Sequence, residues 1–445
     1  MIVEGPNAGA IISLNAIGQQ DTYLTRADPD QSFFNYEMKQ HSTFTKFHRN
    51  TKVDNPGTKA TWPMGETVIV TMNPRNMGDL LSNMYIVIDF PGLTGTSNVA
   101  DQIGRHIIES VSMHVDEIEV EKYHDDWGII YDEMYLDASE KRTKRYTLNR
   151  NLAEGSSIHN DESVVRNSSK LMIPIPLFFS RKYEGDEYST NIPNRPYFPI
   201  CAMHKQKIEF KLKFRPQSFF TNSVDTVTFD NFNIVTEEMT VSPVERSFLM
   251  TKKQVVTTDV VKRHPSVETE IGSSEVKLQL VPKIPVKTIF WFLRNKEFED
   301  ENEIKGSGTT IESNVFENRY NFSSTDTFTT ANSFFNPVMS TGKFYVNGQD
   351  LPNILSPGHA YYKYVVPYLH RLSRPIRNIY TYTFSMNPIN VEPSGSLDFS
   401  KMNSDRTLLD IQLKPAAITD VYTLHLYYVG YQTFEFSNGF MSLAY

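Results

Sequence analysis

The chain has 445 residues, of which 39% are hydrophobic and 22% charged, so wholesale disorder is excluded and two or three domains are expected. Its 29 Phe and 23 Tyr, against 3 Trp, favour strands over helices. The net charge of −8 argues against a protein that coats DNA with its whole surface. No stretch approaches the roughly 20 consecutive apolar residues of a membrane-spanning helix, and the N-terminus lacks the basic region of a signal peptide.

Most of the chain reads as short strands separated by turns. Between 204 and 214, apolar residues alternate with polar ones at Ile208, Phe210, Leu212 and Phe214, as in a half-buried strand. The same alternation recurs at 276–280. Apolar runs predicted as strands inside a sandwich core occur at 66–72, 84–90, 287–293 and 422–429. Together these patterns predict an all-β chain of paired β-sandwiches with a domain boundary near 240–250.

One helix is predicted at 121–136, as a crossover between strands, with Asp125 and Asp126 on its solvated face. Polar stretches at 137–168 and 296–315 are predicted as surface insertions. The first contains a basic run at 141–150 and the second an acidic loop at 297–303, which we expect on different domains with charges that complement each other between neighbouring subunits. The basic run contains Tyr146, an arrangement seen in single-strand binders. In an acidic chain, a solvated loop is the favoured interpretation.

Motifs that carry chemistry are missing from the sequence. Gly342-Lys343 is followed by Phe344 and lacks the opening glycine of a phosphate loop, and no GxGxxG, GxSxG or HExxH motif occurs. His41 and His48 have no acidic neighbours to complete a metal site, and we expect both on the surface. The single cysteine, Cys201, excludes a disulfide framework and is expected to be a small buried hydrophobe. We therefore predict a structural or binding protein that is not an enzyme and has no cofactor and no metal.

Several motifs between residues 20 and 400 occur in the order found in one family of viral proteins. In the first half these are the segments 20–25 and 32–34, with Tyr23, Leu24, Phe33 and Phe34, and the proline-punctuated run 171–179. In the second half they are 244–246, 318–323, 346–350 with Asn347 and Gly348, and 379–400. The last segment contains Tyr380, Tyr382, Phe384, Pro393, Ser394, Gly395 and Phe399. In these stretches the chain resembles the double jelly-roll major capsid proteins of nucleocytoplasmic large DNA viruses. Asp398 and Leu351 depart from the family pattern and leave the virus group open.

The resemblance implies two tandem eight-stranded jelly rolls with a few short helices and long loops: an N-terminal arm at 1–22, a first jelly roll at 23–240 and a second at 244–445. It further implies homotrimeric capsomers of pseudo-hexameric outline that tile an icosahedral shell in the virion, assembled in the host cytoplasm. The implied partners are neighbouring capsomers, minor capsid or cement proteins and an underlying membrane, with no direct nucleic-acid contact. Two alternatives stay open: a minor or vertex capsid paralogue of the same fold, and a jelly-roll carbohydrate-binding protein.

The family motifs also have a physical reading of their own. Asn347-Gly348 is typical of a type I′ hairpin turn, because both residues tolerate positive φ. Pro393, Ser394 and Gly395 form a turn sequence, and Tyr380, Tyr382 and Phe384 alternate on one face of a predicted strand, where they supply core area. The first twenty residues have one charge, Glu4, among small and apolar side chains, so we expect an arm that docks on protein or membrane and does not grip DNA.

Overall fold

The structure is a computed structural model that describes residues 18–19, 41–53, 67–90, 100, 102–141, 169–182, 197–221, 227, 229–299, 318–324, 336–390 and 392–444. The chain divides into two compact units, Met1–Thr43 and Phe44–Tyr445, and the second unit contains every strand reported below. Apart from Gly18 and Gln19, the predicted N-terminal arm lies outside the described residues.

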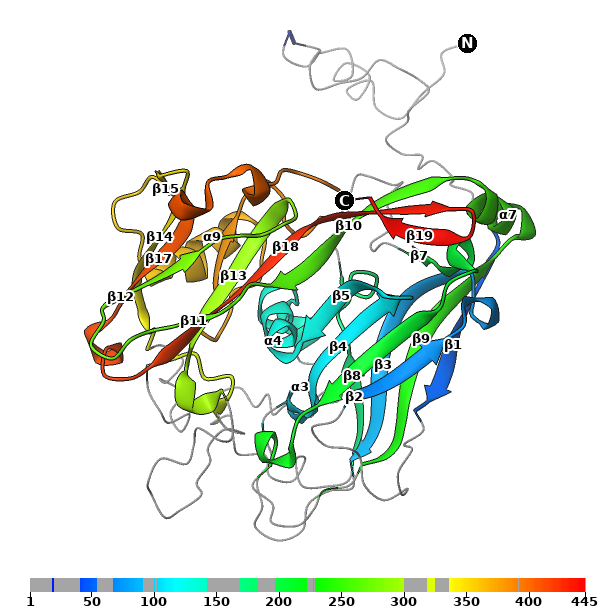
Figure 1. The fold of residues 1–445 in the computed structure, drawn as a ribbon, viewed down its shortest axis with the longest axis horizontal. Coiled ribbons are helices and arrows are strands. Elements are labelled where there is room, and N and C mark those ends of the chain that lie inside the picture. Colours follow the sequence, from blue (N-terminus) through cyan, green and yellow to red (C-terminus); the bar gives the residue numbers. More distant parts are fainter. Residues whose placement is uncertain are drawn as a thin grey trace, which may run out of the picture. The chain divides into compact units, whose positions relative to one another are not determined.

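The first half of the second unit is a sandwich of two antiparallel sheets (Figure 1). One sheet has the order β1-β9-β3-β6, with the short β7 beside β3, and the other has the order β2-β8-β4-β5. The strands are β1 Phe44–Lys52, β2 Thr67–Met72, β3 Leu80–Phe90, β4 Ile108–Val115, β5 Ile118–His124, β6 Ser169–Pro174, β7 Phe198–Pro199, β8 Ile208–Phe214 and β9 Asp230–Val241.

The second half is also a sandwich of two antiparallel sheets. One sheet has the order β10-β18-β13-β16, with β11 and β19 also paired to β18, and the other has the order β12-β17-β14-β15. The strands are β10 Gln254–Arg263, β11 Val267–Glu268, β12 Glu275–Gln279, β13 Val286–Asn295, β14 Met339–Val346, β15 Gln349–Leu351, β16 Tyr380–Thr383, β17 Leu408–Leu413, β18 Tyr422–Ser437 and β19 Phe440–Leu443.

The two sandwiches have the same topology. If the short strands β7, β11 and β19 are left aside, the described strands of each half, counted in chain order, follow 1-8-3-6 in one sheet and 2-7-4-5 in the other. This two-sheet arrangement of eight strands is the jelly roll. The predicted fold of two tandem jelly rolls is therefore confirmed, and the chain carries an internal duplication that leaves no visible sequence repeat.

Short helices fill corresponding places in the two jelly rolls. The α-helices described are α3 Ile103–Ile107, α4 Asp125–Met134, α7 Pro243–Thr251 and α9 Val366–Leu369, and the π-helical turn η6 spans Tyr361–Val365. The 3-10 turns described are η1 Pro74–Asn76, η2 Ile200–Met203, η3 Gln217–Phe219, η4 Lys296–Phe298, η7 Phe399–Lys401, η8 Ser404–Arg406 and η9 Pro415–Ala417. Both α4 and the continuous η6–α9 helix connect the fifth strand of a jelly roll to the sixth.

Two helix predictions need correction. The helix predicted at 121–136 begins only at Asp125, because 121–124 belong to β5, where Glu121 and Tyr123 pair with β4. Within the predicted domain boundary near 240–250, where no helix was expected, Ser242 and Pro243 start helix α7. There the Ser242 side chain accepts a hydrogen bond from the Glu245 amide at 3.3 Å and Pro243 occupies the first helical turn.

Strand β13 belongs to two apolar cores at once, which explains its continuous apolar run. Every residue of β13 is buried. Ile289, Trp291 and Leu293 belong to the core of the second jelly roll, whereas Phe290 and Phe292 belong to the cluster that fills the first. By contrast, β2, also predicted as a core strand, alternates between buried and exposed residues and leaves Ile69 solvent-exposed. The predicted alternation in β8 and β12 is confirmed.

Candidate functional site

Helix α4 of the first jelly roll lies against the second jelly roll, and we call this contact the seam (Figure 1). All ten residues of α4 are buried. The Trp127 ring lies 5.8 Å from the ring of Phe290 on β13 and 6.4 Å from that of Tyr427 on β18. Ile130 and Met134 pack into the core of the first jelly roll. The helix therefore has two apolar faces, one for each jelly roll.

The first turn of α4 places two carboxylates among arginines, and the prediction that Asp125 and Asp126 face solvent is wrong. Asp125 Oδ2 accepts bonds from Arg215 Nη2 and from Arg319 Nε, both at 2.9 Å. Asp126 forms an ion pair with Arg294 of β13 and lies 3.9 Å from Arg319 Nη2. Because Arg294 and Arg319 belong to the second jelly roll, these carboxylates hold the two jelly rolls together from inside.

The arginines keep both carboxylates charged despite their burial. Burial alone would raise the pKa of Asp126, but the charges of Arg294 and Arg319 outweigh it and hold that pKa well below its usual range. The pKa of Asp125 is lowered in the same way, by Arg215 and Arg319 acting against burial. Buried pairs of this kind add little net stability over an apolar contact, but loss of one partner leaves an unpaired charge, which is strongly destabilising. They therefore fix the geometry of the seam more than they strengthen it.

One residue of the predicted acidic loop 297–303, Glu299, belongs to the ion-pair network of the seam. Glu299 Oε2 lies 3.0 Å from Arg294 Nη1, and its other oxygen contacts His425 of β18. The charges of Arg294 and His425 overcome the effect of burial and lower the pKa of Glu299. The prediction of a free surface loop is thus wrong at Glu299, while Glu297 is exposed and 300–303 lie outside the described residues. Of the basic run, Lys141 is described and 142–150 are not.

The other end of α4 and strand β5 add further links across the seam. Glu133 accepts a bond from Arg377 Nη1 at 2.7 Å and from the Ile376 amide at 2.9 Å. Glu121 of β5 accepts a bond from the Val261 amide of β10 at 2.7 Å. Beside this contact, and within the second jelly roll, Lys287 of β13 pairs with Asp259 of β10 at 2.7 Å. Each of these carboxylates is held by a cation or an amide, so the seam has the chemistry of a structural joint.

Of the motif segments predicted from the sequence, 318–323 contributes Arg319 to the seam. Asn347 and Gly348 join β14 to β15 with φ of 51° and 84°, as the predicted type I′ turn requires. Tyr380 is buried in the second core, with Tyr382 and Phe384 packed against it, although Phe384 lies beyond the end of β16. Phe399 is buried 5.7 Å from the Phe384 ring.

The predicted turn at 393–395 is held by its middle residue. Ser394 Oγ accepts from the Asn387 amide and donates to the Asn387 carbonyl, both at 3.0 Å, and Gly395 has a φ of 131°. Pro393 is exposed beside it. Tyr23, Leu24, Phe33 and Phe34 lie outside the described residues.

Sequence reasoning missed the seam roles of Arg215, Arg294, Arg319, Glu133 and Arg377, although Arg319 lies in the predicted motif 318–323. Two local signals pointed to them. Arg294 continues the apolar run 287–293 without an intervening turn residue, and the pair Asp125-Asp126 directly precedes the large apolar Trp127. A charge attached to a fully apolar strand is seldom solvated, because its neighbours in the strand are buried.

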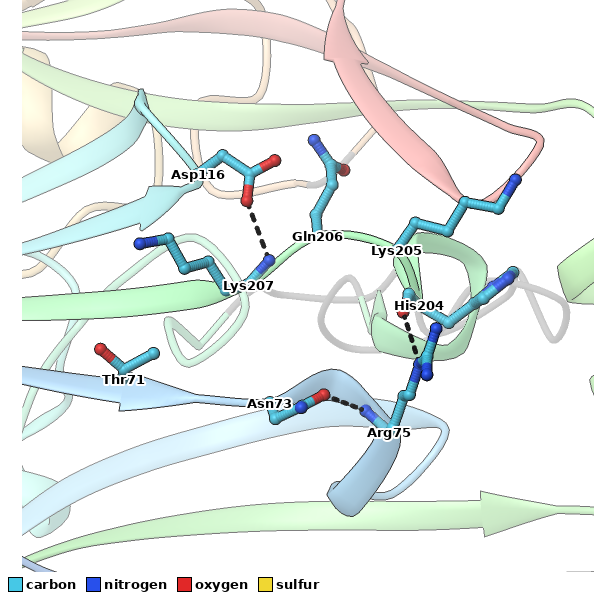
Figure 2. A pocket seen from close by; sticks show the side chains of 8 residues that line it. All are labelled: Thr71, Asn73, Arg75, Asp116, His204, Lys205, Gln206 and Lys207. Atoms are coloured by element: carbon cyan, nitrogen blue, oxygen red, sulfur yellow. Dashed lines mark hydrogen bonds between the residues drawn. The ribbon is translucent and has the colours of Figure 1, made fainter.

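A pocket of about 500 Å³ lies at one end of the first jelly roll (Figure 2). Its lining residues are Thr71, Asn73, Arg75, Asp116, His204, Lys205, Gln206 and Lys207. The Lys207 amide donates to Asp116 Oδ1 at 3.0 Å, and Arg75 Nε donates to the His204 carbonyl at 3.3 Å. The carbohydrate-binding alternative requires a pocket with an aromatic platform, carboxylates or a metal. This lining contains one carboxylate, Asp116, and no aromatic ring apart from the imidazole of His204.

The remaining candidate groups fit structural roles. Cys201 is buried, as predicted, and its burial raises the pKa of its thiol to about 11. His41 and His48 are both exposed, as predicted, and in the described parts of the chain no group of three or more His, Cys, Asp or Glu side chains gathers as a metal site would require. Across those same parts, every helix is too short or too polar to cross a membrane.

Comparison with known proteins identifies the fold and the family. The structure superimposes on the PBCV-1 virus capsid with a TM-score of 0.71 at 16% identity, covering 93% of this chain and 100% of that chain. The Faustovirus major capsid protein gives a TM-score of 0.59 at 10% identity, covering 95% and 96%. In sequence, the major capsid protein of Pyramimonas orientalis virus is 20% identical over 98% of this chain and 99% of its own length. That of Paramecium bursaria Chlorella virus 1 is 21% identical over 92% and 89%.

The fold is thus that of the double jelly-roll viral capsid proteins. Residues 32–245 match the family described as major capsid protein N-terminus, and residues 237–441 match the large eukaryotic DNA virus major capsid protein. The chain belongs to the major capsid proteins of large eukaryotic DNA viruses, and the resemblance identified from its motifs is confirmed.

Proposed function

We propose that this major capsid protein forms homotrimeric capsomers of pseudo-hexameric outline that tile an icosahedral shell. The observation that carries the proposal is that one jelly-roll topology occurs twice in the chain. The two jelly rolls are joined by a buried seam of ion pairs. Each chain contributes two sandwiches of the same topology, so three associated chains contain six sandwiches. The protein acts as a building block and not as a catalyst, and it needs no cofactor or metal.

The same proposal divides the chain into functional parts. Strand β9 ends at Val241 and β10 begins at Gln254, which supports jelly rolls at 23–240 and 244–445 with α7 at the start of the second. The arm at 1–22 docks on minor capsid or cement proteins or on an underlying membrane, and its lack of basic residues favours these partners over DNA. The protein resides in the virion shell, and assembly takes place in the host cytoplasm.

Electron microscopy of the purified protein tests the proposal. We expect uniform particles with a three-fold axis and a hexagonal outline. Particles of single-chain size at every concentration would contradict it. A minor or vertex paralogue would give the same particle, so copy number decides between the two: quantitative mass spectrometry of virions should find this chain as the most abundant shell protein.

A further inference from the structure

A lysine and an aspartate lie in contact inside the second jelly roll, away from solvent. Lys287 Nζ of β13 lies 2.7 Å from Asp259 Oδ2 of β10, and the exposed fractions of the two side chains are 0% and 3%. The other carboxyl oxygen, Asp259 Oδ1, is buried and has no hydrogen-bond partner among the described residues. An ionised carboxylate in a protein interior normally has donors on both oxygens. The pair therefore lacks the surroundings of a well-compensated buried ion pair.

Burial shifts the pKa of both groups toward their uncharged forms. It raises the pKa of Asp259, outweighing the charges of Lys287 and Arg181, and the charge of Glu121 on β5 adds to this rise in pKa. It lowers the pKa of Lys287 despite the charge of Asp259, and the charge of Arg181 lowers that pKa further. A neutral amine has a lone pair that can attack an acyl carbon, and a desolvated lysine is a nucleophile of this kind. In their neutral forms the two side chains are thus an amine and a carboxylic acid in contact.

The surrounding sheet holds the amine and the acid together. Lys287 lies where the pairing of β13 with β18 changes register, and such an irregularity turns a side chain to a new direction. Its Nζ also donates to the Asn390 carbonyl at 2.6 Å and lies 5.4 Å from the centre of the Tyr431 ring. Tyr431 of β18 is in turn the strand partner of Asp259. The lysine side chain therefore reaches across β18 to β10, and its Nζ is fixed beside the carboxyl group.

We propose that Lys287 and Asp259 form an isopeptide bond, a covalent cross-link between β13 and β10. The lone pair of Lys287 Nζ attacks Cγ of Asp259, a C–N bond forms, and the bond from Cγ to the hydroxyl oxygen breaks. The hydroxyl group leaves with one proton from Nζ as a water molecule, so the step needs no oxidant, reductant or further reactant. The 2.7 Å contact places Nζ next to the carbon that it attacks, which is the arrangement that favours reaction within a folded chain.

The cross-link fastens the sheet on which helix α4 packs. In the order β10-β18-β13, β18 lies between the two linked strands, and Trp127 of α4 contacts rings on both β13 and β18. A covalent link of this kind restricts the unfolded chain as a disulfide does. With one cysteine, the chain cannot form an internal disulfide, whereas an isopeptide bond needs no cysteine. The inference goes beyond the proposed capsomer and does not depend on it.

Peptide mapping of the folded, full-length protein by tandem mass spectrometry tests the proposal. Trypsin does not cleave after a lysine whose side chain is in an amide bond. We therefore expect one branched peptide, in which 254–262 is joined to 284–294, with a mass one water molecule below the sum of the two. Recovery of 254–262 and 284–287 as separate peptides from the folded protein would overturn the proposal, whatever the oligomeric state of the chain.

A pair of lysine variants shows whether the lost water comes from this site. Lys287→Arg keeps the positive charge but has no amine to attack the carboxyl group, so the chain should regain the full mass of its sequence. Lys213→Arg is the matched control, because Lys213 pairs with Glu109 at 2.9 Å on the surface, and it should keep the branched peptide. A loss of water that persists in Lys287→Arg would place the modification elsewhere and contradict the proposal. The map of the natural protein decides the question even if Lys287→Arg does not fold.

Discussion

Arg377 donates from Nη1 to Glu133 at 2.7 Å, although 244 residues separate them in the chain. Glu133 lies in the last turn of α4 in the first jelly roll, and Arg377 lies just before β16 in the second. With the Asp125–Asp126 cluster at the other end of the helix, this pair anchors α4 at both ends. This ten-residue helix therefore contributes, together with links such as that of Glu121 to Val261, to the orientation of one jelly roll relative to the other.

Replacing Asp126 with Ala should destabilise the protein by about 3–5 kcal/mol, because Arg294 and Arg319 would be left buried with less compensating charge. The matched control is Glu109→Ala. Glu109 pairs with Lys213 at 2.9 Å on the surface, where such pairs contribute about 0–1 kcal/mol. Denaturant unfolding monitored by tryptophan fluorescence measures both. Equal, small effects for the two variants would show that the seam network does not hold the jelly rolls together.

The stability of the protein should fall with acidification because of His106. Burial, with Arg319 adding to it against the opposing charge of Asp125, lowers the pKa of His106 to about 3. Above pH 6.5 the imidazole is neutral in both the folded and the unfolded chain. Below pH 6.5 the imidazole binds a proton in the unfolded chain, whereas in the folded chain it stays neutral down to about pH 3. This one group should therefore remove about 1.4 kcal/mol of stability per pH unit within that window.

His106→Gln should reduce the slope of the free energy of unfolding against pH between 6.5 and 4 by the contribution of one bound proton, about 1.4 kcal/mol per pH unit. Unfolding measured at a series of pH values gives this slope. Tyr320→Phe is the control, since the Tyr320 ring lies 4.4 Å from the imidazole and the change perturbs the same site without removing the titrating group. A slope that is the same with and without His106 would exclude it as the source of the acid sensitivity.

Gly128→Ala in α4 should destabilise the protein by about 1–3 kcal/mol, although alanine favours helices. The added Cβ would collide with the Tyr123 hydroxyl and lie 2.9 Å from Arg105 Cδ, in a site where Arg105 pairs with Asp132 at 3.1 Å. At Gly358 the added Cβ would meet the Ser340 carbonyl at an ordinary 3.6 Å, so Gly358→Ala should change stability by less than about 0.5 kcal/mol. Differential scanning calorimetry compares the two, and a neutral Gly128→Ala would mean that α4 can move away from Arg105.

Deletion of residues 2–18 should leave the trimer folded and impair assembly of the shell, because these residues are apolar and nearly uncharged and are expected to dock on a partner. The measurement is the yield of closed particles in a reconstituted or cell-based assembly assay, with the solution mass of the truncated protein checked alongside. Assembly as efficient as that of the full chain would show the arm to be dispensable.

The sequence allowed the strands and turns to be predicted, but it did not allow the ion pairs of the seam to be predicted. Alternation at Ile208, Phe210 and Leu212 and the Asn347-Gly348 turn report local geometry, and the structure agrees with both. The partners of Asp125 could not be read in this way. Arg215 is 90 residues away within the same jelly roll, and Arg319 is 194 residues away in the second jelly roll, so neither is a sequence neighbour of the carboxylate. Local patterns also mislead when a residue is buried by a second domain. The two aspartates at the start of α4 resemble a solvated helix face because some of the arginines that pair with them, such as Arg294 and Arg319, belong to the other jelly roll.

Sedimentation velocity and equilibrium over a wide dilution range show whether the chain associates as a trimer. We expect a single species of three times the 51.2 kDa chain mass that persists on dilution, because interfaces in such assemblies bury on the order of 2,000 Å² or more. A monomer that is stable at every concentration, or a dimer, would contradict the closed ring of six sandwiches.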